Sequence, residues 1–220
     1  MTNPVRHIAA WHADFTAVRR DLHMHPELGF EEHRTAKVVC EHLAALGIEY
    51  HAGIGRTGVV AVVPGRSTAS GRSVGLRADM DALPMQEENA FAHKSRYDGR
   101  MHGCGHDGHT TMLLAAARYL HETRAFDGTA YLIFQPGEEG YAGAKEMIAG
   151  GLFERFPAEQ VFALHNWPGL PPGRIGITPG PAMAAADRIS ITIDGSRLRS
   201  TFSAPTSDSA TSPTKRASSS

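Results

Sequence analysis

The sequence has 220 residues, of which 41% are hydrophobic and 20% are charged, and its formal net charge is -1. These values are ordinary for a globular protein with one large domain, or with one domain and part of another. A nearly neutral charge without a basic run argues against a protein that binds nucleic acid or anionic membranes. The start of the chain lacks the apolar region of a signal peptide, no apolar run is long enough to span a membrane, and only two cysteines occur, so we expect a cytoplasmic protein.

Hydrophobic spacing predicts alternating helices and strands along most of the chain. An amphipathic helix is predicted at 31–46, with an inner face of Ala36, Val39, Cys40, Leu43 and Leu46. A second is predicted at 109–123, with an inner face of Met112, Leu113, Ala116 and Leu120, and a third at 144–156. Short β-rich segments predict strands at 58–65, 73–80, 129–136, 161–166, 174–180 and 187–194. This alternation indicates an α/β fold with a largely parallel sheet.

Polar side chains follow three of the predicted strands. Asp79 and Asp81 follow one strand, the adjacent Glu138 and Glu139 follow the next, and His165 closes the third. Taken singly, these residues have ordinary interpretations, namely a strand-end turn, a solvated acidic turn and a structural histidine. In α/β folds, however, ligands bind beyond the carboxyl ends of the strands. The agreement between three strand ends therefore predicts a shared site.

The segment MHGCGHDGHT, residues 101–110, holds three histidines, a cysteine and an aspartate. Cys104 and His106 are separated by one glycine, so both side chains can turn toward one point. A thiolate and an imidazole suit zinc or another borderline transition metal, although a Cys-x-His pair alone is weak evidence for a site. Asp107 could orient a metal ligand. His102 and His109 are interpreted as loop or helix-cap residues rather than ligands.

Five stretches together resemble the M20 metallopeptidase superfamily, and within it the amidohydrolase branch that contains hippurate hydrolases and N-acyl-amino-acid amidohydrolases. These stretches are RRDLHMHPELGFEE (19–32), GLRADMDALPMQE (75–87), MHGCGHDGHT (101–110), FQPGEEGYAGAKEMI (134–148) and LHNWP (164–168). They follow the order and spacing of the family and place residues 15–195 within the resemblance. The combination is specific to the family, although each stretch alone is not.

The resemblance implies a three-layer α/β/α catalytic domain of zinc-peptidase type that binds two divalent metal ions, Zn or Mn, with Co or Ni as alternatives. The implied metal ligands are Cys104, His106, Glu139 and His165. Glu138 is implied as the general base that activates water, and Asp81 as a supporting carboxylate at the catalytic site. The implied substrate is a small N-acylated amino acid, hippurate-like or N-acetylated, whose amide bond is cleaved. The alternatives are a dipeptidase of M20 type, a deacetylase of N-acetyl-diaminopimelate, and a truncated remnant without activity.

The chain departs from the family in its length. Family members are expected to be much longer and to insert a small lid domain, which mediates dimerisation and is followed by a further histidine ligand. We therefore interpret residues 1–186 as part of the catalytic domain, 187–195 as the start of the lid domain and 196–220 as an aberrant tail. Without the lid we do not expect the homodimer of the family, and we expect weak metal retention, poor solubility and little turnover.

Residues 196–220 contain nine Ser and four Thr and almost no apolar side chains. This composition is typical of a disordered segment. A second interpretation is that these residues derive from the original gene read one base out of frame. Codons offset by one base allow the pattern H-x-x-x-P-H-L-G from Ser200–Thr201 onward, which resembles the family motif expected there. The nucleotide sequence would distinguish the two interpretations.

Overall fold

The computed structural model describes residues 3–177 and 179–180. These residues fall into two units that divide between Pro168 and Gly169. Every helix and strand of the described residues lies in the first unit. The described residues of the second unit include a turn in which Arg174 N donates a hydrogen bond of 3.1 Å to Pro171 O. None of the described helices combines the length and apolar character needed to cross a lipid bilayer.

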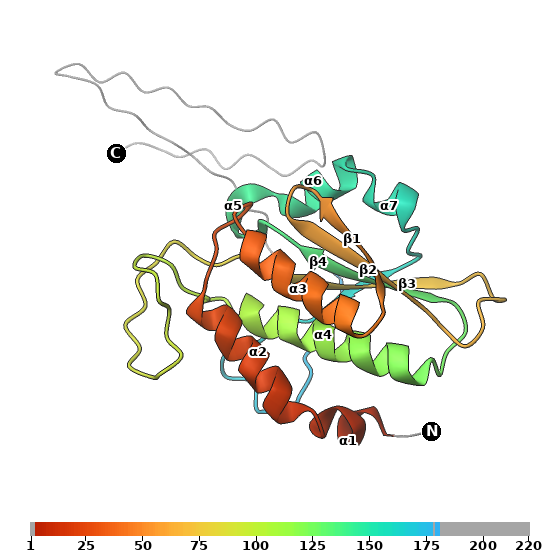
Figure 1. Cartoon of the computed structure of the whole chain (residues 1–220), viewed down its shortest axis with the longest axis horizontal. Coiled ribbons are helices and arrows are strands. Elements are labelled where there is room, and N and C mark those ends of the chain that lie inside the picture. Colours follow the sequence, from red (N-terminus) through yellow and green to blue (C-terminus); the bar gives the residue numbers. More distant parts are fainter. Residues whose placement is uncertain (1–2, 178, 181–220) are drawn as a thin grey trace, which may run out of the picture. The chain divides into compact units, whose positions relative to one another are not determined.

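Five strands form one mixed sheet in the order β1-β2-β4-β3-β5 (Figure 1). Their bounds are β1 (Glu49–Ile54), β2 (Gly58–Pro64), β3 (Ser73–Asp79), β4 (Thr129–Gln135) and β5 (Val161–Ala163). Strand β3 is parallel to β4 and β5, whereas β2 is antiparallel to β1 and β4. The prediction of a largely parallel sheet is therefore wrong for the half that contains β1 and β2. The connection between these two strands is too short for a crossover, and a short hairpin can join only antiparallel strands.

Helices cover both faces of the sheet. Their bounds are α1 (Pro4–Ala9), α2 (His12–Met24), α3 (His33–Ala45), α4 (His106–Thr123), α5 (Glu138–Tyr141), α6 (Gly143–Ala149) and α7 (Leu152–Arg155). Figure 1 shows α2, α3 and α4 side by side, with α6 and α7 at the other side of the strands. The α/β/α arrangement predicted from the resemblance is confirmed.

Alternation along the strands supplies two separate cores. Every second residue of a strand points to the same face, so neighbouring residues of β2 enter different cores. The larger core packs α3 and α4 on the sheet and includes Val39, Leu43, Val59, Ala61, Leu113, Leu114, Leu132 and Phe134. The smaller core packs α6 and α7 on the opposite face and includes Val60, Ile133, Met147, Leu152 and Phe156. Burial on both faces holds the strand ends in fixed positions.

The predicted helices are present with altered bounds. The helix predicted at 31–46 is α3, and Cys40 packs partly buried against the larger core, as predicted. Helix α4 begins at His106, earlier than predicted, and its face is rotated. Met112, predicted to face inward, is 47% exposed, whereas Leu114 and Ala117 are buried. The helix predicted at 144–156 is broken into α6 and α7, because Gly151 has a left-handed φ of 84°.

Three of the predicted strands match β2, β3 and β4 to within one residue. The strand predicted at 161–166 ends at Ala163, and the described residues of 174–180 form no strand. The strand predicted at 187–194, the domain boundary at residue 186 and the tail at 196–220 lie outside the described residues. The sequence pattern did not predict α1, α2 or β1. Strand β1 is an edge strand with mostly exposed side chains, so it lacks the apolar alternation that signals a strand.

Candidate metal centre

The carboxyl ends of β3, β4 and β5 meet at one edge of the sheet, and polar side chains from each gather there. Asp79 is the last residue of β3, Glu138 begins α5 just after β4, and His165 follows β5. The connection from β3 returns to the same edge at His106, the first residue of α4. We call these side chains the strand-end cluster, which consists of Asp79, Asp81, Cys104, His106, Glu138, Glu139 and His165.

Ligand-type atoms of the strand-end cluster and of the neighbouring His109 converge in three groups, in each of which the atoms lie within 4.8 Å of one another. The groups are Cys104–His106–His165, His106–Glu138–Glu139 and Asp79–His106–His109. The Cys104 Sγ atom lies 3.3 Å from His165 Nε2, and His106 Nε2 lies 3.8 Å from Glu139 Oε1. All four residues that the resemblance implied as ligands are therefore close together, with His106 common to every group.

His106 has the surroundings expected of a ligand. Its side chain is 0% exposed, yet neither ring nitrogen has a hydrogen-bond partner among the described residues. Buried polar atoms are nearly always hydrogen-bonded, so two unpartnered nitrogens mark a place where another group belongs. His106 Nδ1 is 3.4 Å from Asp81 Oδ1, and His106 Nε2 is 3.5 Å from Asp79 Oδ2. A thiol, imidazoles and carboxylates around buried nitrogens fit a transition-metal ion.

Asp81 fixes the position of the two adjacent glutamates. Its Oδ1 accepts a hydrogen bond of 3.0 Å from Glu138 N, and its Oδ2 accepts one of 2.9 Å from Glu139 N. Burial acts to raise the pKa of Asp81, but the nearby His106 ring and the hydrogen bonds from these two backbone groups outweigh it and lower the pKa. Asp81 is therefore ionised, and its two hydrogen bonds connect the turn after β4 to the residues that follow β3.

Glu32 supports the same turn from the opposite side, a role that sequence reasoning missed. Its side chain is 0% exposed, and it accepts hydrogen bonds from Gly137 N at 2.7 Å and Thr57 Oγ1 at 2.6 Å. Burial raises the pKa of Glu32. The carboxylates of Asp81 and Glu32 thus accept hydrogen bonds from three successive backbone N–H groups, at residues 137–139, where α5 begins.

The electrostatics of the cluster favour an added cation. Burial and the neighbouring Glu139 raise the pKa of Cys104 to about 12, and burial together with Glu139 also raises the pKa of Glu138. Burial would raise the pKa of Asp79, but the hydrogen bond with His109 and the charge of His106 lower it to about 2. A thiol surrounded by carboxylates does not ionise readily by itself. A metal ion beside it reverses this balance and stabilises the thiolate.

Asp107, which the sequence suggested as an orienting residue for a metal ligand, makes its hydrogen bonds elsewhere. Its Oδ2 accepts hydrogen bonds from His23 Nδ1 at 2.9 Å and from Arg19 Nε at 3.1 Å. His23 Nε2 lies 3.2 Å from Glu87 Oε1, and the ring of His102 packs nearby, 6.2 Å from that of His23. We call His23, Glu87, His102 and Asp107 the anchor cluster.

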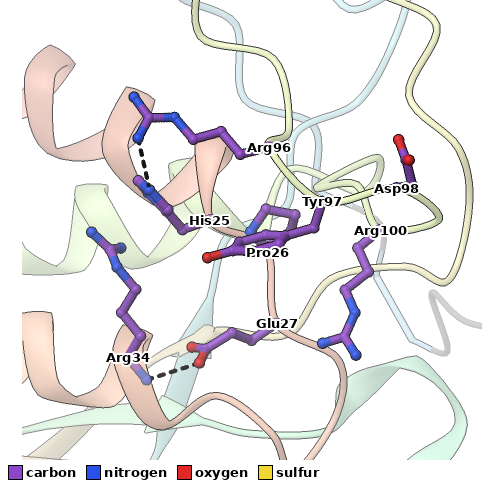
Figure 2. Close-up of a pocket in the computed structure, with 8 residues that line it drawn as sticks. All are labelled: His25, Pro26, Glu27, Arg34, Arg96, Tyr97, Asp98 and Arg100. Carbon is purple, nitrogen blue, oxygen red and sulfur yellow. Dashed lines mark hydrogen bonds between the residues drawn. The ribbon is translucent and has the colours of Figure 1, made fainter.

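The HMHPEL segment, residues 23–28, also supports neighbouring structure. The carboxylate of Glu27 accepts hydrogen bonds of 2.9 Å from Arg34 N and 2.8 Å from Thr35 N at the start of α3. Its backbone oxygen accepts a bond of 2.8 Å from Ala82 N, beside Asp81. Figure 2 shows Glu27 bonded to Arg34 at the rim of a cavity of about 590 Å³, which His25, Pro26, Arg96, Tyr97, Asp98 and Arg100 also line. The segment thus positions α3 and the residues that follow β3.

His109 lies inside α4, although the sequence suggested a loop or helix-cap position. It is 3% exposed, and its Nδ1 is 2.6 Å from Asp79 Oδ1. His102 does lie in the loop before α4, where it is buried. Sequence spacing could have placed His109 on the same helical face as His106, because residues three apart lie on one side of a helix.

Comparison with known proteins gives matches along most of the chain. The model of the family described as "Peptidase family M20/M25/M40" matches residues 75–218. Hippurate hydrolase from Campylobacter jejuni is 45% identical over 193 residues, which are 88% of this chain and 50% of that protein. N-acyl-L-amino acid amidohydrolase from Geobacillus stearothermophilus is 45% identical over 184 residues, which are 83% of this chain and 49% of that protein.

A solved structure agrees with the sequence matches. The crystal structure of the Bacillus subtilis YXEP protein, a dinuclear metal binding peptidase from the M20 family, is 42% identical and has a TM-score of 0.77. The similarity covers 82% of this chain and 50% of that one. The chain thus spans about half the length of the curated relatives it matches. Since the family model covers well over half of the sequence, the resemblance inferred from the motifs is confirmed, and the chain belongs to peptidase family M20/M25/M40.

Proposed function

We propose that the strand-end cluster binds two divalent metal ions and hydrolyses the amide bond of small N-acylated amino acids. The observation that carries this proposal is the convergence of thiol, imidazole and carboxylate groups around the unpartnered nitrogens of buried His106. The relatives support the substrate class, because hippurate hydrolase, N-acyl-L-amino acid amidohydrolase and N-acetylcysteine deacetylase all have names that specify an N-acylated amino acid. Hippurate and N-acetyl amino acids are therefore the first substrates to test.

The proposed metal ligands are Cys104, His106, Glu139 and His165. We propose Zn or Mn as the metal, with Co or Ni as alternatives, and the thiolate of Cys104 favours the softer ions among these. When bound, two divalent ions polarise the scissile carbonyl and lower the pKa of water. Asp81 positions His106 and both glutamates, because its carboxylate lies beside His106 Nδ1 and accepts hydrogen bonds from the backbone of Glu138 and Glu139.

Glu138 is the proposed general base. Its carboxylate belongs to the group formed with His106 and Glu139, so it lies beside the proposed ligands. Its backbone is fixed by Asp81, which restricts the directions that the side chain can take. In this role Glu138 accepts a proton from the attacking water and then delivers it to the departing amine.

The test compares the 220-residue protein with its Glu138→Gln variant. We expect equal metal contents in both proteins when metal is supplied in the buffer. Hydrolysis of hippurate or N-acetyl amino acids should be slow, because the chain spans only about half the length of its relatives, and a chelator should abolish it. Loss of the base should lower the rate by about 10²–10⁴-fold. Glu154→Gln, which changes an exposed glutamate of α7, is the matched control and should leave the rate unchanged.

Other outcomes identify the alternatives. Bound metal without hydrolysis that depends on Glu138 would favour an inactive remnant that still binds metal. Faster cleavage of dipeptides or of N-acetyl-diaminopimelate would favour the corresponding peptidase or deacetylase. A wild-type protein that binds no divalent metal would refute the proposal.

A further inference from the structure

His165 occupies a segment that packing alone holds weakly. Strand β5 pairs with β3 over only three residues and ends at Ala163. The side chains around this segment point into solvent, since Phe162, Leu164 and Trp167 are 55%, 62% and 71% exposed. A ligand that lies beyond the end of a short edge strand needs a further restraint to present its nitrogen in a fixed direction.

The residue after His165 supplies that restraint. His165 Nδ1 lies 2.6 Å from the backbone oxygen of Asn166, and His165 Nε2 faces Cys104 Sγ at 3.3 Å. Histidines that bind metals usually donate their other ring N–H to a carbonyl or carboxylate, which fixes both the tautomer and the ring direction. The position of Asn166 therefore decides where His165 points.

Asn166 is in turn held by His109. His109 Nε2 lies 2.7 Å from Asn166 Oδ1 and 3.3 Å from Asn166 N. The opposite nitrogen, His109 Nδ1, is bound to Asp79 at 2.6 Å. Asp79 and His109 are almost fully buried, at 1% and 3% exposure, so the connection starts from a rigid part of the fold. A continuous chain of contacts thus runs from Asp79 through His109 and Asn166 to His165.

His109 and His106 differ in whether their ring nitrogens already have hydrogen-bond partners. Both imidazoles lie close enough to Asp79 to form a group of metal-ligand type. His109 already uses both ring nitrogens, one with Asp79 and one with Asn166, whereas both nitrogens of His106 are unpartnered among the described residues. An imidazole can bind a metal only through a free nitrogen, so His106 is available as a ligand and His109 is not.

We propose that His109 is a positioning residue, which acts through Asn166 to orient His165 toward Cys104 and His106 and does not itself bind the metal. This inference rests on the proposed function, because it concerns the same metal centre. According to this inference, His109 and Asn166 raise the metal affinity by orienting His165, although neither binds the metal.

The experiment measures Co²⁺ affinity by competition with a chelator, and counts imidazole ligands by X-ray absorption, in the 220-residue protein. The variants are His109→Gln, Asn166→Ala and the double variant. The control is His121→Gln, which changes a histidine near the other end of α4. Loss of a supporting residue typically lowers metal affinity by about 10–100-fold, and we expect this loss in each single variant. Each should also lose one imidazole ligand, and the double variant should bind no more weakly than the weaker single variant, because both act on His165.

Different failures remain distinguishable. If His109→Gln loses an imidazole while Asn166→Ala keeps full affinity, His109 is itself a ligand and the inference is overturned. Unchanged affinity in both variants also overturns it, and the metal centre would stand. A wild-type protein without bound Co²⁺ would refute the proposed function and this inference together. Asn166 is exposed, so Asn166→Ala carries the test alone if thermal unfolding shows that His109→Gln does not fold.

Discussion

The strand-end cluster and the anchor cluster are built from the same residue types, and the first turn of α4 contributes to both. His106 points into the strand-end cluster, where carboxylates approach its nitrogens but, in the part of the chain that the structure describes, form no hydrogen bond with them. The next residue, Asp107, points into the anchor cluster and bonds to His23 and Arg19. Two adjacent side chains therefore serve two polar clusters with different properties.

In the anchor cluster, His23 pairs with carboxylates of the protein itself. His23 lies between two carboxylates, and the hydrogen bond with Asp107 raises its pKa. Burial opposes ionisation of Asp107 and Glu87, but hydrogen bonds, including those with His23, lower the pKa of both. Glu87 also accepts hydrogen bonds from the long connection between β3 and α4, through Asn89 Nδ2 at 2.9 Å and Ser95 N. The anchor cluster therefore fastens this connection to α2 and α4.

His102 shows which property separates the two clusters. Both of its ring nitrogens are buried and, like those of His106, have no hydrogen-bond partner within residues 3–177 and 179–180. Burial lowers the pKa of His102 to about 4, so its ring is neutral at physiological pH. Within the part of the chain that the structure describes, however, His102 belongs to none of the groups close enough to hold a metal. An unpartnered imidazole does not make a metal site unless other ligand atoms converge on it.

The largest expected effect is the loss of metal affinity in His106→Ala, for which His102→Ala is the comparison. Removing a supporting residue typically costs about 10–100-fold in metal affinity, so loss of a shared ligand in His106→Ala should cost more than about 100-fold. His102→Ala removes an equally buried histidine and should change affinity only slightly. Zn²⁺ or Co²⁺ competition titrations measure both values. Equal losses in the two variants would contradict the distinction between the clusters.

His23→Gln tests the anchor cluster by its effect on stability. The variant leaves the nearly buried carboxylates of Glu87 and Asp107 without their shared partner. Breaking a buried ion pair typically costs about 3–5 kcal/mol. Because Arg19 still contacts Asp107 in the variant, we expect a loss of about 3 kcal/mol in unfolding free energy. Urea unfolding with a chelator present measures it, and His12→Gln, an exposed change on the same helix, is the control. Metal stoichiometry should stay unchanged in His23→Gln.

Gly105→Ala should disturb the contact between the loop before α4 and Asn166. Gly105 has a φ of 93°, and a Cβ atom there would lie 2.4 Å from Asn166 Oδ1. Gly99→Ala is a close control, because Gly99 also has a positive φ, 72°, but a Cβ atom there would meet none of the described residues within 4 Å. Both variants should lose about 1–2 kcal/mol of unfolding free energy from backbone strain. Only Gly105→Ala should also bind metal more weakly, by about tenfold.

The smallest effect is the pH dependence of stability. The pKa of His23 is raised above 6.5, so its contribution is complete below pH 6.5 and is lost as the pH rises through its folded pKa. The pKa values of Asp107 and Glu87 are lowered from 3.8 and 4.5, so their contributions are lost as the pH falls below this range. The difference in unfolding free energy between wild type and His23→Gln should therefore be greatest between pH 4.5 and 6.5. A difference that grows above pH 6.5 would contradict this account of the anchor cluster. Its charged or titratable neighbours include Arg19 beside Asp107, His93 beside His23, and His106 and Asp81 near His102.

Local sequence features were sufficient for much of the fold and for the composition of the candidate site. Short runs rich in β-branched and aromatic residues predicted β2 and β4, because a strand that is buried on both faces is apolar at nearly every position. The Cys-x-His pair and the adjacent glutamates pointed to metal chemistry because ligand types occur at short spacing. The edge strand β1 was missed because its side chains are mostly exposed and form no apolar pattern. The break at Gly150–Gly151 was missed because the apolar residues on either side of it still follow a helical spacing.

The sequence alone determined where residues of metal-ligand type occur and which strands place them at a common edge, because residue type and the apolar pattern of a strand are local properties. Only the tertiary structure decided which of these groups form hydrogen bonds with one another. Glu32 holds Gly137 across 105 positions, and His23 holds Asp107 across 84. It also decided that, among the described residues, His106 has no hydrogen-bond partner while both ring nitrogens of His109 have one, although the two lie on the same helix. Such pairings depend on how distant segments pack, and a local pattern contains no record of that packing.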